Sequence, residues 1–316
     1  MSAAAPGQIS VPDRLARNVA AVRPEDADRW LAALPALVTA ELARLGLTLD
    51  RVLDPGGSLA LVAYVHRDDD LAPAVLKVSL RTPGTAHEAE ALTVWAGRGA
   101  VLLLGTAAPD PGTTVLLLER LHGGIPLRSL AEPKAMLEAT SLLHRLWAPV
   151  PADHPFDGVP APSPSASGTA TGTGRAGAAA GLPAEAEPLL AEARETAVAL
   201  AASATEEFLL HGDFHHGNVL AADRAPWLAI DPRPLVGERA YDLARLALDR
   251  ADTLVGSPGL PAAVRRRLHQ LAEALEVDRE RLRDWTLVRA VDLAVDALAA
   301  GRRTDAELYL EFAGAL

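Results

Sequence analysis

The sequence predicts an α+β protein with two lobes. The first, residues 1–120, is small and contains an antiparallel sheet; the second, residues 121–316, is larger and mainly helical. Two observations lead to this prediction. Strand-like apolar runs dominate up to about residue 120, whereas the periodic segments after about residue 184 mostly repeat at helical spacing. The chain of 316 residues is 49% hydrophobic, which is enough for one large domain or for two lobes that each have a core.

In the N-terminal half, residues 26–46 carry apolar positions at helical spacing, and Pro35 predicts a kink or break in that helix. A second helix is expected over residues 87–97, where Gly97 ends it. Four segments favour strands, and the first two are joined by an acidic turn: 59–66, 74–80, 100–105 and 113–120.

The C-terminal half begins with a Gly-rich breaker, residues 121–127, which is typical of a hinge. A flexible insertion is expected at about residues 158–182, because Pro, Gly, Ala, Ser and Thr there bury too little to offset the cost of ordering. Short strands are expected before residue 211, after residue 217 and over residues 226–232. Helices are expected over six segments: 134–147, 184–202, 238–250, 261–275, 279–300 and 304–313.

Composition excludes several classes of function. The net charge is −11 and the chain has no long run of Lys or Arg, so we expect no nucleic-acid partner. The absence of cysteine excludes disulfides, thiolate metal sites and a cysteine nucleophile. No uninterrupted apolar run is long enough for a membrane span, and no secretory signal is evident, so we expect a cytoplasmic protein without a membrane partner.

Polar chemistry is concentrated in residues 209–220, LLHGDFHHGNVL. Asp213 and Asn218 lie five residues apart in a predicted loop, and Asp231 follows thirteen residues after Asn218 at the end of a predicted strand. Phosphoryl transfer from ATP needs one carboxylate to orient the acceptor hydroxyl, and an amide oxygen and a second carboxylate to bind Mg²⁺. These three residues provide those groups in the order that kinases use.

The N-terminal lobe offers the remaining parts of a nucleotide site. Lys77 lies in a predicted strand and could hold phosphates, while Glu88 begins a predicted helix and could fix the lysine. The turn formed by Gly56, Gly57 and Ser58 is small enough for backbone N–H groups to approach phosphates. Glu90 lies in the same helical turn as Glu88 and is the alternative partner for Lys77.

These motifs resemble the aminoglycoside phosphotransferase family. HGDFHHGNVL is similar to its HGDxxxxN signature, and PWLAIDPRPLVGERAYDLARL (residues 226–246) resembles the branch of the streptomycin 6-kinases and hydroxyurea kinases. ISVPDRLARN, WLAALPALV and LLLERL are similar to that branch too. The resemblance covers nearly the whole chain except the 158–182 insertion, and it implies a two-lobed protein-kinase-like fold.

Carried over by resemblance, the motif residues take specific roles. The resemblance implies that Asp213 is the catalytic carboxylate and that Asn218 and Asp231 are Mg²⁺ ligands. It also implies that Lys77 binds the phosphates and forms an ion pair with Glu88. The segment from Glu119 to Leu121 becomes the hinge beside adenine. The family implies ATP and Mg²⁺ as cofactors and a small cationic antibiotic as the partner, most simply streptomycin. The turn at residues 56–58 departs from the GxGxxG of protein kinases, which leaves its phosphate contacts open.

Four alternatives stay open at this point. In the first alternative, the acceptor is another small molecule such as hydroxyurea. In the second, the chain binds nucleotides without catalysis. His211, His215 and His216 have spacings also found in zinc hydrolases, although a second cluster of such ligands is missing from the sequence. Asp292 and Asp296, four apart on an apolar helix, either bind cationic groups of a substrate or face solvent and pair with Arg289.

Overall fold

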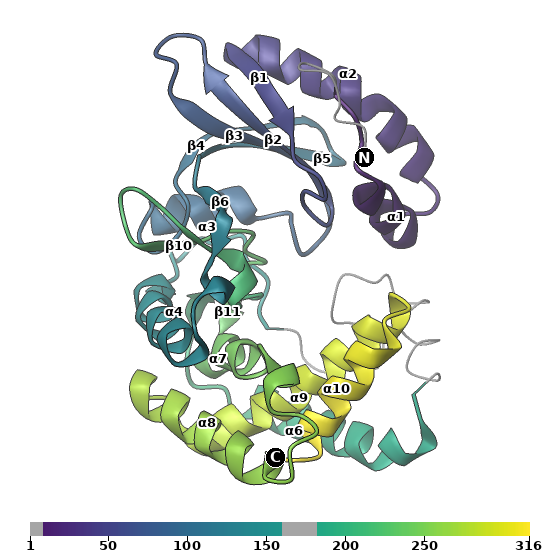
Figure 1. The fold of residues 1–316 in the computed structure, drawn as a ribbon, viewed down its shortest axis with the longest axis vertical. Helices are drawn as coiled ribbons and strands as arrows, with labels where there is room; N and C mark the ends of the chain where they lie inside the picture. The colour runs from purple at the N-terminus through teal and green to yellow at the C-terminus, as the bar shows by residue number, and fades with distance from the viewer. Residues whose placement is uncertain (1–8, 160–181) are drawn as a thin grey trace. The chain divides into compact units, whose positions relative to one another are not determined.

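The computed structural model describes residues 9–159 and 182–316 of the chain. Its contacts divide the chain into two compact units, one ending at His122 and the other beginning at Gly123. The N-terminal unit contains a sheet and the C-terminal unit is mainly helical (Figure 1), so the prediction of an α+β fold is confirmed. Most of the insertion expected at residues 158–182 lies outside the described residues.

The N-terminal unit is built on an antiparallel five-stranded sheet with the order β1-β2-β3-β5-β4. The strands are β1 (Leu47–Val52), β2 (Ala60–Arg67), β3 (Pro73–Leu80), β4 (Leu103–Asp110) and β5 (Thr113–Glu119). Strand β3 is central, and Lys77 on it faces Val62 of β2 and Leu116 of β5 in the register. A lysine in a strand is usually exposed on an edge strand. Lys77 instead lies on the central strand of the sheet.

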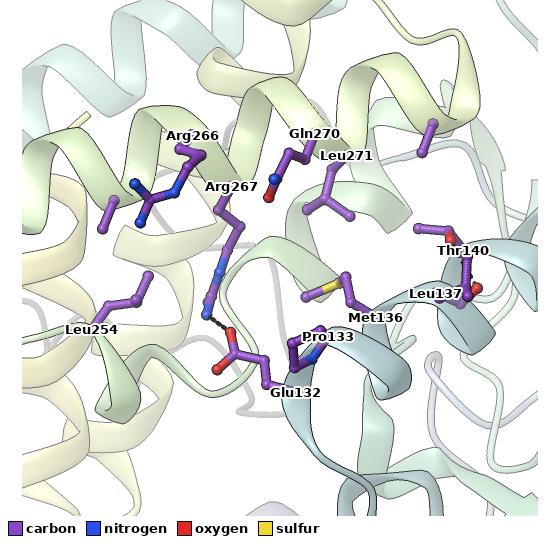
Figure 2. A pocket seen from close by; sticks show the side chains of 12 residues that line it. Glu132, Pro133, Met136, Leu137, Thr140, Leu254, Arg266, Arg267, Gln270 and Leu271 are labelled. Atoms are coloured by element: carbon purple, nitrogen blue, oxygen red, sulfur yellow. Dashed lines mark hydrogen bonds and ion pairs between the residues drawn. The ribbon is translucent and has the colours of Figure 1, made fainter.

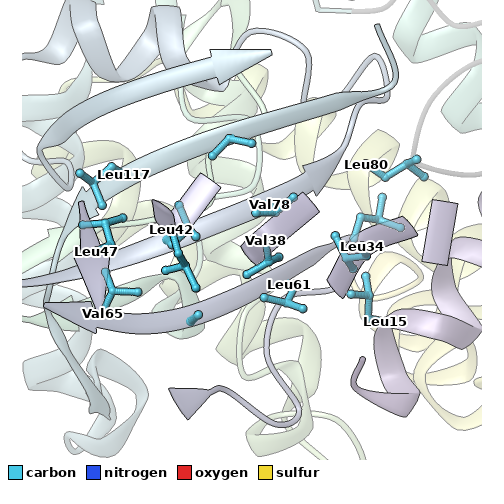
Figure 3. Packing of buried hydrophobic residues seen from close by; sticks show 14 of the residues in the cluster. Leu15, Leu34, Val38, Leu42, Leu47, Leu61, Val65, Val78, Leu80 and Leu117 are labelled. Carbon is cyan, nitrogen blue, oxygen red and sulfur yellow. The ribbon is translucent and has the colours of Figure 1, made fainter. Parts of the chain in front are cut away.

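Three helices complete this unit: α1 (Asp13–Val22), α2 (Ala27–Leu45) and α3 (Glu88–Trp95). Figure 3 shows side chains of α1 and α2, among them Leu15 and Val38, packed against strand residues such as Leu61. Each fully buried aliphatic side chain contributes about 1.5–3 kcal/mol relative to exposure. Neither α1 nor β1 was expected from the sequence.

The break expected at Pro35 does not occur, because α2 continues through this residue to Leu45. Leu34 and Val38, which flank the proline, are almost fully buried in the core. A proline within a helix loses one backbone hydrogen bond, and we attribute the intact helix to this apolar packing.

The C-terminal unit contains three short strand pairings and a set of helices. Its strands are β6 (His122–Pro126), β7 (Ala148–Pro149), β8 (Phe208–Leu210), β9 (Val219–Ala221), β10 (Trp227–Ala229) and β11 (Leu235–Gly237). The α-helices are α4 (Glu132–Leu146), α6 (Glu187–Ala202), α7 (Arg239–Ala247), α8 (Leu260–Leu275), α9 (Arg279–Ala299) and α10 (Arg303–Ala313). Helix α9 contacts α6, α7, α8 and α10 and forms the centre of the unit.

Two strand predictions need correction. The segment 121–127, expected as a Gly-rich breaker, contains strand β6, which pairs with β9 in a sheet of order β10-β9-β6, whereas the hinge expected there stays a prediction. Its pairing uses main-chain groups alone, so the two glycines do not prevent it. Strand β4 begins at Leu103 instead of residue 100. Among the described residues, no helix is long and apolar enough to cross a membrane.

Candidate functional site

Lys77 and Glu88 form a buried ion pair in the N-terminal unit. The Lys77 Nζ lies 2.6 Å from Glu88 Oε1 and 2.7 Å from Oε2, and the two side chains are only 9% and 2% exposed. Glu90, the alternative partner, is 46% exposed and lies 3.7 Å from His87. Glu88, in the first turn of α3, is therefore the partner that fixes the lysine on the central strand.

The turn before β2 is held by helix α1. Gly56 has a φ of +61°, and a Cβ at this position would lie 2.7 Å from the Leu53 carbonyl oxygen, so glycine is required there. Arg14 Nη2 donates to Ser58 Oγ at 2.9 Å, and Asn18 Nδ2 donates to the Ser58 carbonyl at 3.0 Å. The sequence analysis did not identify Arg14 or Asn18, because helix α1 itself was not expected.

Glu119 and Leu121 end the N-terminal unit. The Glu119 backbone N–H donates to the Leu102 carbonyl at 3.0 Å, and Glu119 Oε1 accepts from the Leu102 N–H at 2.7 Å. Leu121 is buried. The glutamate side chain therefore has a structural task in ordering the segment before β4, in addition to the role that the family resemblance implies.

In the C-terminal unit, Asp242 supports the loop that carries the HGD motif. This carboxylate is fully buried and accepts hydrogen bonds from the His211 N–H at 2.8 Å, the Gly212 N–H at 2.7 Å and Trp147 Nε1 at 3.3 Å. Burial raises the pKa of Asp242, and the charge and hydrogen bonds of its neighbours oppose that rise. Because Asp242 accepts hydrogen bonds from the loop backbone, it holds the HGD loop in place.

His211 and Gly212 pack the loop against the segment that follows Asp231. Burial lowers the pKa of His211, and its Nε2 donates to the Ile230 carbonyl at 3.0 Å in the neutral tautomer that fits these contacts. Gly212 has a φ of +78°, and a Cβ there would lie 1.9 Å from the Arg233 carbonyl oxygen. The close approach requires glycine and joins the two motif segments directly.

The other two histidines of the motif also make loop contacts. Burial, together with the nearby charge of Arg245, lowers the pKa of His215 to about 4, and its Nδ1 accepts from the Gly217 N–H at 3.1 Å. His216 is fully buried, and its N–H and Nδ1 both bind the carboxylate of Asp249. Within residues 9–159 and 182–316, no three His, Asp or Glu side chains gather as a metal site.

Asp213 lies beside two arginines, Arg233 and Arg245. Arg245 Nε, on α7, donates to Asp213 Oδ1 at 3.0 Å, while Arg233 Nε lies 3.8 Å from Oδ2. Burial by itself would raise the pKa of Asp213, but Arg233 and Arg245 hold it well below its usual range. Asp213 is therefore a carboxylate at neutral pH, and among the described residues its Oδ2 accepts no hydrogen bond.

Asn218 lies beside Asp213 and is tied to the Asp231 segment. Its Nδ2 donates to the Asp213 carbonyl at 3.0 Å, which leaves the amide oxygen as the group for a cation. The Ile230 N–H donates to the Asn218 carbonyl at 2.9 Å, so Asp231 follows directly on a residue bonded to Asn218. An amide and a carboxylate oxygen are hard ligands, and this donor chemistry fits Mg²⁺.

Asp292 and Asp296 lie on α9 and are partly buried instead of fully exposed. Burial lowers the pKa of Arg289, but Tyr241, Asp292, Asp213 and Asp296 raise it overall. Arg289 donates to the Tyr241 hydroxyl at 2.7 Å and to the Gly212 carbonyl at 3.3 Å. The two aspartates therefore belong to the charged surroundings of the loop.

A cavity of about 500 Å³ lies elsewhere in this unit, between α4 and α8. Figure 2 shows the Glu132–Arg267 ion pair on its wall, with Met136 and Leu271 close by. None of Asp213, Asn218 and Asp231 lines it. The cavity is thus separate from the residues that the motifs single out.

Comparisons with known proteins show the family of the chain. The family model for "Aminoglycoside/hydroxyurea antibiotic resistance kinase" matches residues 46–301. A streptomycin 6-kinase of Streptomyces glaucescens is 36% identical over 287 residues, covering 91% of this chain and 90% of the relative. A hydroxyurea phosphotransferase of Kitasatospora aureofaciens is 39% identical over 280 residues, covering 82% of this chain and 71% of the relative.

The fold has solved counterparts as well. A crystal structure of a thermostable mutant of aminoglycoside phosphotransferase APH(4)-Ia, in a ternary complex with ADP and hygromycin B, superposes with a TM-score of 0.57. The two sequences are 16% identical, and the match covers 88% of this chain and 96% of the other. At this identity the likeness shows the fold alone.

Proposed function

The chain belongs to the aminoglycoside/hydroxyurea antibiotic resistance kinase family, and from this premise we propose that it transfers the γ-phosphoryl group of ATP to a hydroxyl of streptomycin or a related cationic aminoglycoside. The observation that carries the proposal is the state of Asp213. It is ionised, fixed through Oδ1, and has Oδ2 available beside Asn218. A general base must meet the acceptor hydroxyl in this form.

In this proposal Asp213 is the catalytic residue. Its Oδ2 accepts a hydrogen bond from the acceptor hydroxyl and orients the oxygen for in-line attack on the γ-phosphorus. The donor from Arg245 keeps the carboxylate from rotating away, because Oδ1 is already bound at 3.0 Å. Burial of Asp242 and His211 makes the loop rigid, which suits a group that acts by positioning.

Asn218 and Asp231 are the residues that would hold Mg²⁺. The bound cation would neutralise charge on the phosphate oxygens during transfer. Lys77, fixed by Glu88, would hold the α- and β-phosphates. The backbone of Gly56, Gly57 and Ser58 would approach the phosphate chain, and the segment from Glu119 to Leu121 would bind adenine.

The acceptor is cationic in this proposal, and the acidic character of the protein favours such a ligand. The net charge is −11, and Asp292 and Asp296 are candidates to contact guanidinium or ammonium groups of the drug through charge-assisted hydrogen bonds. ATP is supplied in the cytoplasm, where we expect the enzyme to act. The hydroxyurea phosphotransferase relative, at 39% identity, favours hydroxyurea as the second candidate acceptor.

The test is ADP formation from ATP and Mg²⁺ with streptomycin, with hydroxyurea and without acceptor. We expect ADP formation above background with streptomycin. If neither compound raises turnover, the proposed substrate class is wrong, and nucleotide binding without turnover would indicate a non-catalytic module. The acceptor can be ranked independently, because the true ligand raises the unfolding temperature of the protein in the presence of a non-hydrolysable ATP analogue.

A further inference from the structure

The loop from Asp213 to Asn218 has no lysine or arginine of its own. Its four inner residues are Phe214, His215, His216 and Gly217. His215 Nδ1 accepts from the Gly217 N–H, and His216 is fully buried against Asp249. A phosphoryl group in transfer spreads negative charge over three oxygens, and phosphotransferases place a cation beside them. Apart from the Mg²⁺ proposed above, a cationic side chain of the C-terminal unit has to come from another segment.

Arg233 is placed to provide it. The residue stands two positions after Asp231. Its backbone is anchored to the HGD loop, because its N–H donates to the His211 carbonyl at 2.8 Å and its own carbonyl oxygen packs on Gly212. The guanidinium therefore starts from a fixed point between the proposed Mg²⁺ ligand and the proposed catalytic carboxylate.

The two arginines beside Asp213 differ in how much of their bonding capacity is used. Arg245 is 11% exposed and donates to Oδ1 at 3.0 Å. Arg233 is 38% exposed and lies 3.8 Å from Oδ2, and its side chain makes no hydrogen bond among the described residues. A guanidinium has five N–H donors in a fork that matches phosphate oxygens. Arg233 therefore has these donors available among the described residues, whereas Arg245 uses its Nε on the carboxylate.

We propose that Arg233 is a catalytic residue that contacts the transferring phosphoryl group, as an arginine finger supplied by the chain itself. The inference rests on the proposed function and deepens it. In the step, the acceptor oxygen forms a bond to the γ-phosphorus while the bond from that phosphorus to the β–γ bridging oxygen breaks. ADP leaves, and the hydroxyl proton passes to Asp213 and then to solvent. Arg233 binds equatorial oxygens of the transferring phosphoryl group, and the guanidinium stays protonated throughout the step.

The experiment compares R233M and R233K with R265M, an exposed arginine on α8 that serves as the matched control. We expect R233M to lower kcat with streptomycin by at least about 10²-fold while the Kd for ADP changes less than about threefold. R233K should retain more activity than R233M, because it keeps the charge but loses the fork. R265M should behave like the wild type.

Two readouts separate this role from a structural one. Binding of ADP with aluminium fluoride, which imitates the transferring phosphoryl group, should weaken in R233M much more than binding of ADP. Added guanidinium ion at millimolar concentration should restore part of the R233M activity. An R233M enzyme with kcat within about threefold of an active wild type overturns the inference and leaves the proposed function standing. Equal losses of ADP and ADP–aluminium fluoride binding also overturn it.

If R233M does not fold, R233K decides the question by the same comparison of ADP with ADP–aluminium fluoride. Wild-type protein that phosphorylates no acceptor removes the proposed function and this inference with it.

Discussion

The two units of the molecule each bury a carboxylate against cations, but in different ways. In the N-terminal unit, Glu88 and Lys77 form a buried ion pair in which both carboxylate oxygens contact one Nζ. In the C-terminal unit, Asp213 faces Arg245 and Arg233, and one of its oxygens accepts no hydrogen bond among the described residues. The first arrangement fixes the position of a lysine, whereas the second keeps a carboxylate charged with one oxygen not hydrogen-bonded among the described residues. In the proposed function the first pair holds phosphates and the second carboxylate meets the acceptor hydroxyl.

The largest effect should come from breaking the Lys77–Glu88 ion pair. Lys77→Met removes the cation that both oxygens of the buried Glu88 carboxylate contact, and breaking a buried ion pair in this way costs about 3–5 kcal/mol of folding free energy. The double variant K77M/E88L removes both charges and should recover most of that loss. Urea unfolding of the two variants measures the difference. Equal stability of K77M and the double variant would show that the pair is not the source of the cost.

The next effect concerns the reacting carboxylate. Asp213→Asn keeps the shape of the side chain but removes the base, so kcat should fall at least about 10²-fold, or ~2.7 kcal/mol, with the KM for ATP little changed. Asp223→Asn, an exposed aspartate between β9 and β10, is the control and should leave kcat unchanged. Activity of D213N above about a tenth of wild type contradicts the assignment.

A smaller effect is expected when the carboxylate is kept but its support is removed. Arg245→Met deletes the donor to Asp213 Oδ1, and a freely rotating carboxylate should lower kcat about tenfold, or ~1.4 kcal/mol. Steady-state kinetics with saturating ATP checks this. The kcat of Arg245→Lys should lie between those of the wild type and Arg245→Met, because lysine restores the charge but not the geometry of the guanidinium. A rise in KM for ATP at unchanged kcat would place Arg245 in nucleotide binding instead.

The smallest effect is a pH dependence of stability. Burial would raise the pKa of Asp249, but the hydrogen bond and charge of its histidine neighbours lower it well below the usual range. A carboxyl group whose folded pKa is depressed stabilises the fold above its unfolded pKa of about 3.9 and loses that contribution as the pH falls further. Below about pH 4, the unfolding temperature of the wild type should therefore fall more steeply with decreasing pH than that of D249N. Parallel curves for the two proteins would exclude Asp249 as the cause.

The sequence was sufficient for the class of fold and for the residues that lie within motifs. Long periodic segments predicted helices such as α8 and α9 to within a residue or so of their observed ends. The spacing from Asp213 to Asn218 identified two residues that are in contact, and Lys77 with Glu88 is a second such pair. The helices were predictable from local apolar periodicity, and the paired residues were predictable from the order of the motifs along the chain.

What the sequence did not indicate depends on packing between distant segments. Strands of two or three residues, such as β7 and β11, have no periodicity to detect. Arg233 and Arg245 are two of 30 Lys and Arg residues, and no spacing distinguishes them. They become significant only when β8, the following loop and α7 bring them to Asp213. The Gly-rich breaker predicted at residues 121–127 was wrong for the same reason, since β9 supplies the pairing that makes β6 a strand.

The central claim is that this chain phosphorylates a small cationic antibiotic by means of Asp213. Its most direct test is mass spectrometry of streptomycin after incubation with ATP, Mg²⁺ and either wild-type protein or D213N. The account predicts that wild type converts the drug to a species heavier by one phosphoryl group, and that D213N forms it at least about 10²-fold more slowly. Unmodified streptomycin after prolonged incubation with wild-type protein, or equal conversion by D213N, would contradict it.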